Sequence, residues 1–290
     1  MIIQLLKEAV KDTAFRLSKP KEIEIQGFKL FINTKEPSFS MRRTLRYYAE
    51  TKAHEPSTTS VFRSIIKEGD MVVDIGANIG YFSLLAASLG ARVYAFEPDK
   101  KNMAYLLKNA KLNGYGIIAS PKAISNKNEA TKLYICSYDS GHHTINQNKG
   151  IKDYRRTSAL RKCLNLFSQK KVLVDTIRLD DFIREKVDII KMDCEGAEAL
   201  AFEGMDGILK ENLSIKLIVE FFPLLLESMG SSPKDFINKI LGYGFRIGVI
   251  PYDYDSGKAK IVKSYEELME ICKGRGSHIN LILKRDVIQQ

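Results

Sequence analysis

Residues 72–90, VVDIGANIGYFSLLAASLG, contain the pattern that decides the fold. An apolar run beginning at Val72 ends in a turn that holds Gly76 and Gly80, and an apolar helical pattern follows. Glycine permits positive φ and lets a backbone approach a ligand closely. The start of a helix also presents free N–H groups. The stretch therefore predicts a buried strand, a tight turn and a helix. A ligand site at the turn and a purely structural turn both fit it.

The alternation of strands and helices continues beyond this turn. Further strands are expected at RVYAFE, VDIIKMD, KLIVEFF, FRIGVI and HINLILK, with helical patterns between most of them. Strands separated by helices of this length indicate βαβ units and a parallel sheet, although an antiparallel last strand also fits. We therefore predict an α/β domain over residues 55–290. Residues 1–54 are predicted to form an extension with an amphipathic helix and a hairpin around Gly27.

The composition is that of a folded globular protein, with 44% hydrophobic and 28% charged residues. A net charge of +10 favours an anionic partner such as nucleic acid, a phosphorylated sugar or a membrane surface, but scattered surface lysines give the same value. The four cysteines form no C-x-x-C pair, so neither a zinc site nor a redox motif is expected. A reducing cytoplasm is the default location, and no apolar run is long enough for a transmembrane segment.

A basic insertion at about residues 140–171 interrupts the alternation. It contains eight lysines and arginines against one acidic residue, Asp153. Such an insertion often forms a lid or a binding loop, and a solvated basic helix is the alternative. His142 and His143 stand at its start, and His142 is a candidate base or substrate contact. Adjacent residues seldom supply two ligands to one ion, so we predict no metal site of these histidines with Glu195.

An acidic residue follows the second strand at the distance typical of a nucleoside site. Glu97 ends RVYAFE, 21 residues after Gly76, where a carboxylate can accept hydrogen bonds from both ribose hydroxyls. A dinucleotide site would show G-x-G-x-x-G, whereas this turn is D-x-G-x-x-x-G with Asp74 on the strand. Asp74 can bind a backbone amide or an ammonium group. An amino acid joined to a nucleoside offers a binding partner to both Asp74 and Glu97. We therefore predict S-adenosylmethionine rather than NAD as the cofactor.

Five segments in order resemble the FkbM-type methyltransferases. They are residues 54–114, which include the glycine turn, then KAISNKN, DTIRLDDFI, DIIKMDCEGAEALAFEGM and LIVEFFP, covering about residues 55–223. The resemblance implies a class I methyltransferase fold, which is Rossmann-like, with a seven-stranded sheet, helices on both faces and an antiparallel final strand. It also implies S-adenosylmethionine as methyl donor. The cofactor contacts that it implies are Glu55, Asp74, Gly76, Ala77, Asn78, Gly80, Glu97, Ala123 and Asp193.

The motif Asp-x-Glu-Gly-x-Glu follows the strand DIIKM. The resemblance places Asp193 nearest the transferred methyl group, while Glu195 and Glu198 are candidates to hold the acceptor, act as base or bind a cation. Methyl transfer from a sulfonium depends on alignment and exclusion of water, and a base assists a hydroxyl acceptor. From spacing alone, Asp193 as a helix N-cap and the glutamates as helix-dipole partners fit equally well. Glu220, near the end of KLIVEFF, is a further candidate substrate contact.

These features predict an S-adenosylmethionine-dependent enzyme that O-methylates a hydroxyl of a sugar, glycan or other small metabolite. A second hypothesis is an RNA methyltransferase that uses the basic insertion to hold RNA. The lack of a D/N-P-P-Y sequence and of tryptophan for base stacking disfavours it. A third hypothesis is a non-catalytic binding protein with a methyltransferase fold. The intact glycine turn, Glu97 and the carboxylates near Asp193 disfavour that role.

Overall fold

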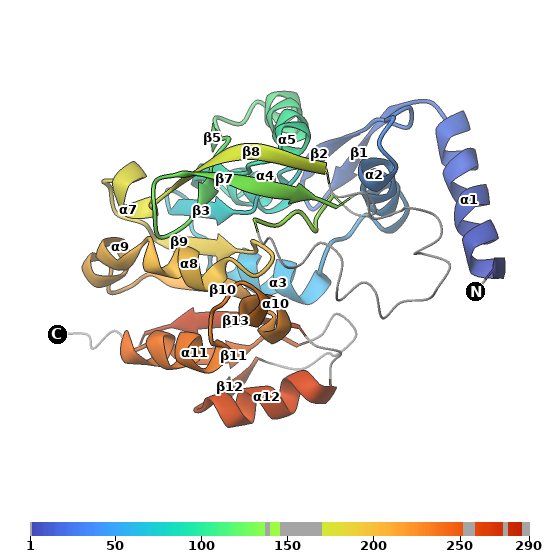
Figure 1. The fold of residues 1–290 in the computed structure, drawn as a ribbon. Helices are drawn as coiled ribbons and strands as arrows, with labels where there is room; N and C mark the ends of the chain where they lie inside the picture. Colours follow the sequence, from blue (N-terminus) through green and yellow to red (C-terminus); the bar gives the residue numbers. More distant parts are fainter. Residues whose placement is uncertain (1, 137–139, 146–169, 252–258, 275–277, 286–290) are drawn as a thin grey trace.

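A mixed sheet of eight strands forms the middle layer of the molecule (Figure 1). The computed structural model describes residues 2–136, 140–145, 170–251, 259–274 and 278–285. In spatial order the strands are β12 (Lys260–Val262), β11 (Arg246–Val249), β13 (Ile279–Lys284), β10 (Lys216–Phe221), β9 (Ile189–Met192), β3 (Met71–Ile75), β4 (Arg92–Phe96) and β5 (Ile118–Ser120). The strands from β10 to β5 run parallel, and β13 is antiparallel to both of its neighbours. The predicted α/β class is confirmed.

The sheet has one strand more than the seven that the family resemblance implies. The additional strand, β12, pairs antiparallel with β11 at the edge of the sheet, where Val262 lies opposite Ile247. It contains three residues within the lysine-rich run AKIVK, and this alternation is too short to identify a strand from sequence. The count of seven therefore missed an edge strand.

Helices cover both faces of the sheet, as Figure 1 shows. One apolar core includes side chains of α3 (Pro56–Ile65), α4 (Tyr81–Ser88) and α5 (Lys100–Asn113). The other includes side chains of α7 (Leu179–Phe182), α8 (Glu198–Glu203), α9 (Asp206–Glu211), α10 (Pro223–Ser228), α11 (Pro233–Gly242) and α12 (Tyr265–Gly274). All five residues of β3 are buried because both faces of this central strand are covered.

The N-terminal segment forms α1 (Ile2–Leu17), the hairpin of β1 (Lys21–Ile25) and β2 (Phe28–Ile32), and α2 (Phe39–Thr51). Leu30 and Ile32 of the hairpin are fully buried and belong to the same apolar core as α4 and α5. Helix α1 lies at the periphery beside α2, held by a bidentate pair in which Arg42 donates to both carboxylate oxygens of Asp12 at 2.8 Å. The domain boundary that we placed after residue 54 stays a prediction.

A second sheet with the order β6 (Ala123–Ile124), β8 (Lys170–Ile177) and β7 (Ala130–Ile135) lies beside the first. The predicted basic insertion falls between β7 and β8, and residues 146–169 of it lie outside the described part of the chain. Its beginning is described, and Thr144 there pairs with Tyr134 of β7. In the described segments, none of the helices combines the length and the apolar character needed to cross a membrane.

Candidate active site

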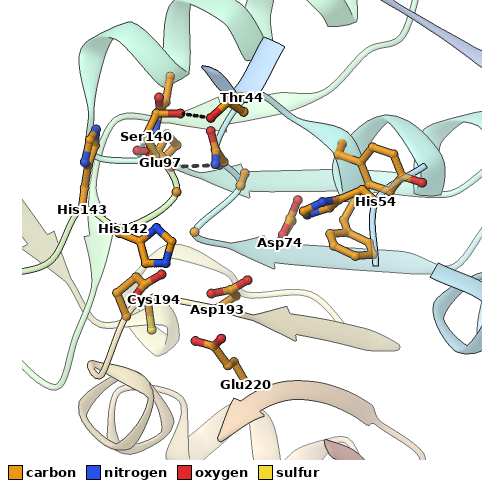
Figure 2. Close-up of a pocket in the computed structure, with 18 of the residues that line it drawn as sticks. Thr44, His54, Asp74, Glu97, Ser140, His142, His143, Asp193, Cys194 and Glu220 are labelled. Carbon is orange, nitrogen blue, oxygen red and sulfur yellow. Dashed lines mark hydrogen bonds between the residues drawn. The ribbon is translucent and has the colours of Figure 1, made fainter. Parts of the chain in front are cut away.

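A cavity of about 620 Å³ lies at the carboxyl ends of β3, β4, β9 and β10 (Figure 2). Open parallel sheets bind ligands at this edge, and the volume falls within the range of small-molecule sites. Other walls come from α1, α2, the loop before α3, the start of α4, β6, β7 and residues 140–145. Segments that are distant in the sequence therefore meet around one space.

The turn after β3 brings the backbone close to the end of β9. Gly76 has φ of +80°, and a Cβ atom on it would lie 1.8 Å from the carbonyl oxygen of Asp193. The N–H groups of Gly76 and Ala77 both donate to the carbonyl of Phe96 at 3.0 Å. Gly80, with φ of +94°, is the N-cap of α4 and does not line the cavity, whereas Gly76, Ala77 and Asn78 do. Glycine at position 76 thus allows the two strand ends to approach.

Glu97 lies at the end of β4 with only 5% of its surface exposed. Its carboxylate accepts hydrogen bonds from the backbone N–H groups of Asn78 and Asp99, both at 2.8 Å. Burial raises the pKa of Glu97 to about 8 in spite of these bonds. The side-chain oxygens of Asn78 and Asn102 are also buried in the cavity wall, and neither has a hydrogen-bond partner among the described residues. This end of the cavity therefore offers acceptors to the hydroxyl and amino groups of a nucleoside.

Asp74 and Glu55 lie at the other end of the predicted cofactor site. Asp74 is 1% exposed, and one of its oxygens accepts a hydrogen bond from the Ser83 hydroxyl at 2.6 Å. The other oxygen has no hydrogen-bond partner in the described structure, and burial raises the pKa of this carboxyl. Glu55 precedes α3 and accepts a hydrogen bond at 3.0 Å from Asn280 of β13. Both carboxylates line the cavity, where they suit a cationic amino group.

Asp193 follows β9 and forms an ion pair with Lys191. It does not cap a helix, because the N-cap of α8 is Ala197. The ammonium of Lys191 donates to Asp193 Oδ2 at 2.9 Å. Burial raises the pKa of Asp193, but the positive charge of Lys191 outweighs it and holds the pKa below its ordinary value. The sequence analysis missed Lys191. The signal was a lysine inside the run IIKM, whose other three residues are all apolar.

Three carboxylates meet below the predicted cofactor site. Asp193, Glu195 and Glu220 each have an oxygen within 4.8 Å of the others, and Figure 2 shows Asp193 and Glu220 facing one another. Burial, followed by the charge of Asp193, raises the pKa of Glu220 well above its usual range. One oxygen of Glu220 is buried with no hydrogen-bond partner in the described segments. Such a group can accept a proton or hydroxyl hydrogen bonds, and its oxygens are also ligands of the type that divalent cations take.

The remaining predicted residues divide between the cavity and the turn after β9. Ala123 and His142 line the cavity, as does His143, whose Nδ1 accepts a hydrogen bond from the Cys136 N–H at 3.1 Å. Glu198 is fully buried and does not line it. One of its oxygens accepts hydrogen bonds from the N–H groups of Cys194 at 2.9 Å and Gly196 at 3.3 Å. Glu198 therefore stabilises the turn that presents Asp193 and Glu195.

An aromatic wall was not predicted from the sequence. The rings of Tyr48 and Tyr81 stack with centroids 5.6 Å apart, and His54 lies 5.1 Å from Tyr81. All three line the cavity, together with Tyr47 and Phe82. Because these residues come from α2, α4 and the loop between α2 and α3, spacing in the sequence could not bring them together. The available signals were the position of His54 beside Glu55 and that of Tyr81 and Phe82 directly after the glycine turn.

A family model for the methyltransferase FkbM domain matches residues 74–247. The chain belongs to the FkbM methyltransferase family. Its cofactor is S-adenosylmethionine, as the sequence predicted. Of the predicted cofactor contacts of this FkbM protein, all except Gly80 line one cavity.

Solved structures of other methyltransferases are similar to the FkbM chain. A methyltransferase FkbM from Methylobacillus flagellatus is 14% identical with a TM-score of 0.43, and the match covers 97% of this chain and 60% of that one. An rRNA methylase from Streptococcus thermophilus is 10% identical, with a TM-score of 0.43 and coverage of 79% and 93%. A TehB-like SAM-dependent methyltransferase from Corynebacterium glutamicum is 10% identical, with a TM-score of 0.44 and coverage of 87% and 100%. None of the curated proteins compared with the chain matches it.

Proposed function

We propose that this FkbM protein transfers the methyl group of S-adenosylmethionine to a hydroxyl group of a sugar, glycan or other small metabolite. The observation that carries the proposal is the position of the three carboxylates Asp193, Glu195 and Glu220 in the same cavity as Glu97 and Asp74. A neutral polyhydroxylated acceptor donates hydrogen bonds readily to carboxylates. A carboxylate beside the attacking oxygen can also take its proton.

Different residues of the cavity bind the cofactor, orient the acceptor and accept its proton in this proposed reaction. The bound cofactor supplies an activated methyl group, so the chain has to hold it, align the acceptor and exclude water. In this proposal Asp74, Glu97 and the turn from Gly76 to Asn78 bind the cofactor. Asp193 is kept ionised by Lys191 and orients the acceptor hydroxyl, because a carboxyl with a lowered pKa is a poor proton acceptor. Glu195, Glu220 and His142 are the candidate bases.

The charge of the cavity supports a small neutral acceptor over RNA. Its described wall contains eight acidic residues, Glu8, Glu50, Glu55, Asp74, Glu97, Asp193, Glu195 and Glu220. It contains four lysines and arginines, Lys11, Arg43, Arg46 and Lys191. An RNA-binding site needs an excess of positive charge to neutralise phosphates, and the described wall has no excess of basic over acidic side chains.

Methyl transfer from tritiated S-adenosylmethionine tests the proposal. The purified protein is incubated separately with neutral oligosaccharides, with hydroxylated small metabolites and with total RNA, and labelled products are identified by mass spectrometry. We expect label in a hydroxylated acceptor as an ether that survives mild base. Glu220→Gln should lower the transfer, while the exposed Glu227→Gln serves as the matched control. Label in RNA alone would contradict the proposed acceptor class.

A further inference from the structure

Lys191 places a buried positive charge in the wall of the cavity. Its side chain is 5% exposed, and its ammonium lies 4.7 Å from the centre of the Phe82 ring. The ammonium has three donors, and the hydrogen bond to Asp193 uses one of them. Within the described residues no hydrogen bond uses the other two donors, and Lys191 lines the cavity, so they can reach a bound ligand.

The surroundings keep this lysine charged. Burial lowers the pKa of Lys191, but the charges of Asp193, Glu55 and Asp74 outweigh burial and hold the pKa above its ordinary value. Two of these carboxylates, Asp74 and Glu55, lie at the end of the cavity opposite Glu97. That end therefore presents one cation and several anions side by side, which is the complement of a zwitterion.

The amino-acid part of S-adenosylmethionine is such a zwitterion, with an α-carboxylate and an α-ammonium on one carbon. We propose that the ammonium of Lys191 binds the α-carboxylate of the cofactor, while Asp74 and Glu55 face its α-ammonium. The free oxygen of Asp74 supports this orientation, because it is buried in the wall without a hydrogen-bond partner in the described structure. The proposal rests on the cofactor of the family and is independent of the identity of the methyl acceptor.

His54 is the rival group for the carboxylate at this end of the cavity. It lies beside Asp74 in Figure 2, and its Nε2 is 3.4 Å from a carboxylate oxygen of Glu55. Its side chain is 29% exposed, against 5% for Lys191. A hydrogen bond between opposite charges is stronger where water is excluded, so Lys191 is the better partner. His54 gives the test a direct competitor.

Calorimetric titration with two ligands separates carboxylate binding from every other effect of the lysine. One ligand is S-adenosylhomocysteine, and the other is S-adenosyl-3-thiopropylamine, which lacks only the carboxylate. We expect the wild-type protein to bind the first ligand about 10- to 100-fold more tightly, as a charge-assisted hydrogen bond predicts. In Lys191→Met this ratio should fall close to one, because the variant loses the partner of the carboxylate. Lys191→Gln repeats the test with a polar side chain in case the methionine variant does not fold.

Lys186→Met is the matched control, because Lys186 also pairs with an aspartate two residues later, Asp188, but lies outside the cavity. It should keep the wild-type ratio. An unchanged ratio in both Lys191 variants, with both ligands weakened equally, would overturn the proposal and leave Lys191 only as the partner of Asp193. A ratio that collapses in His54→Gln instead would assign the carboxylate to His54. Failure of the wild type to bind either ligand would contradict the cofactor itself, which is a separate result.

Discussion

The raised pKa of Glu97 predicts that cofactor binding depends on pH near neutrality. The carboxyl has a pKa of about 8 in the ligand-free protein because it is buried, whereas a ribose needs the ionised form as an acceptor of two hydroxyl hydrogen bonds. At pH 7 ionisation of Glu97 then costs about 1.4 kcal/mol, which weakens binding roughly tenfold. The affinity for S-adenosylhomocysteine should therefore rise about tenfold from pH 6 to pH 7 and level off above pH 8.

Titration calorimetry between pH 6 and pH 9 measures this rise. Repeating the pH 7 titration in two buffers with different ionisation enthalpies counts the released protons, and we expect about one. Glu97→Gln is always neutral, so its weaker binding should not change with pH. The same shift makes the ligand-free fold lose stability as pH rises from the ordinary carboxyl range toward 8, because the folded state favours the protonated form. An affinity that stays constant or falls between pH 6 and pH 8 would refute this reasoning.

Three further predictions concern the packing around the cavity. Gly76→Ala should abolish S-adenosylhomocysteine binding in calorimetry, because its methyl group would overlap the carbonyl of Asp193; normal binding would contradict the close approach. Arg42→Met should lower the free energy of unfolding in urea by about 3–5 kcal/mol, since it leaves Asp12 buried without its partner. Adding Asp12→Leu should recover most of that loss, and a further decrease would argue against the pair. Asn280→Leu should weaken S-adenosylhomocysteine binding by about 1–3 kcal/mol, because Glu55 and Thr58 at the start of α3 each lose a hydrogen bond of 3.0 Å from Asn280. An unchanged affinity would show that these two bonds do not position the cofactor site.

Local patterns were sufficient for much of the fold. The strand, turn and helix around Gly76 could be predicted because the spacing of apolar residues and glycines within fewer than twenty residues is sufficient to indicate them. β12 was missed because three residues carry too little periodicity. β8 was not predicted as a strand because its first two residues, Lys170 and Lys171, belong to the predicted basic insertion.

The site residues that could be predicted were those whose place follows from local sequence patterns and sheet topology. Asp74 and Glu97 stand at strand ends, so the topology of a parallel sheet brings them to one edge. Lys191 looked like an ordinary strand residue because two of the carboxylates that raise its pKa, Asp74 and Glu55, lie more than a hundred residues away in the chain. The carboxylate of Glu198 could not be separated from that of Glu195 by spacing, since the direction of each side chain depends on a turn with positive φ at Glu195.

The position of β13 has a consequence for how the protein acquires its activity during synthesis. This strand lies between β10 and β11, although both of them precede it in the chain. The ribosome therefore releases β10 and β11 before the strand that joins them exists, and their facing edges stay unpaired until residues 279–284 emerge. Asn280 then reaches the loop before α3, more than two hundred residues earlier in the sequence. The cofactor site is thus completed late in synthesis, and nascent chains that lack β13 should not retain S-adenosylmethionine.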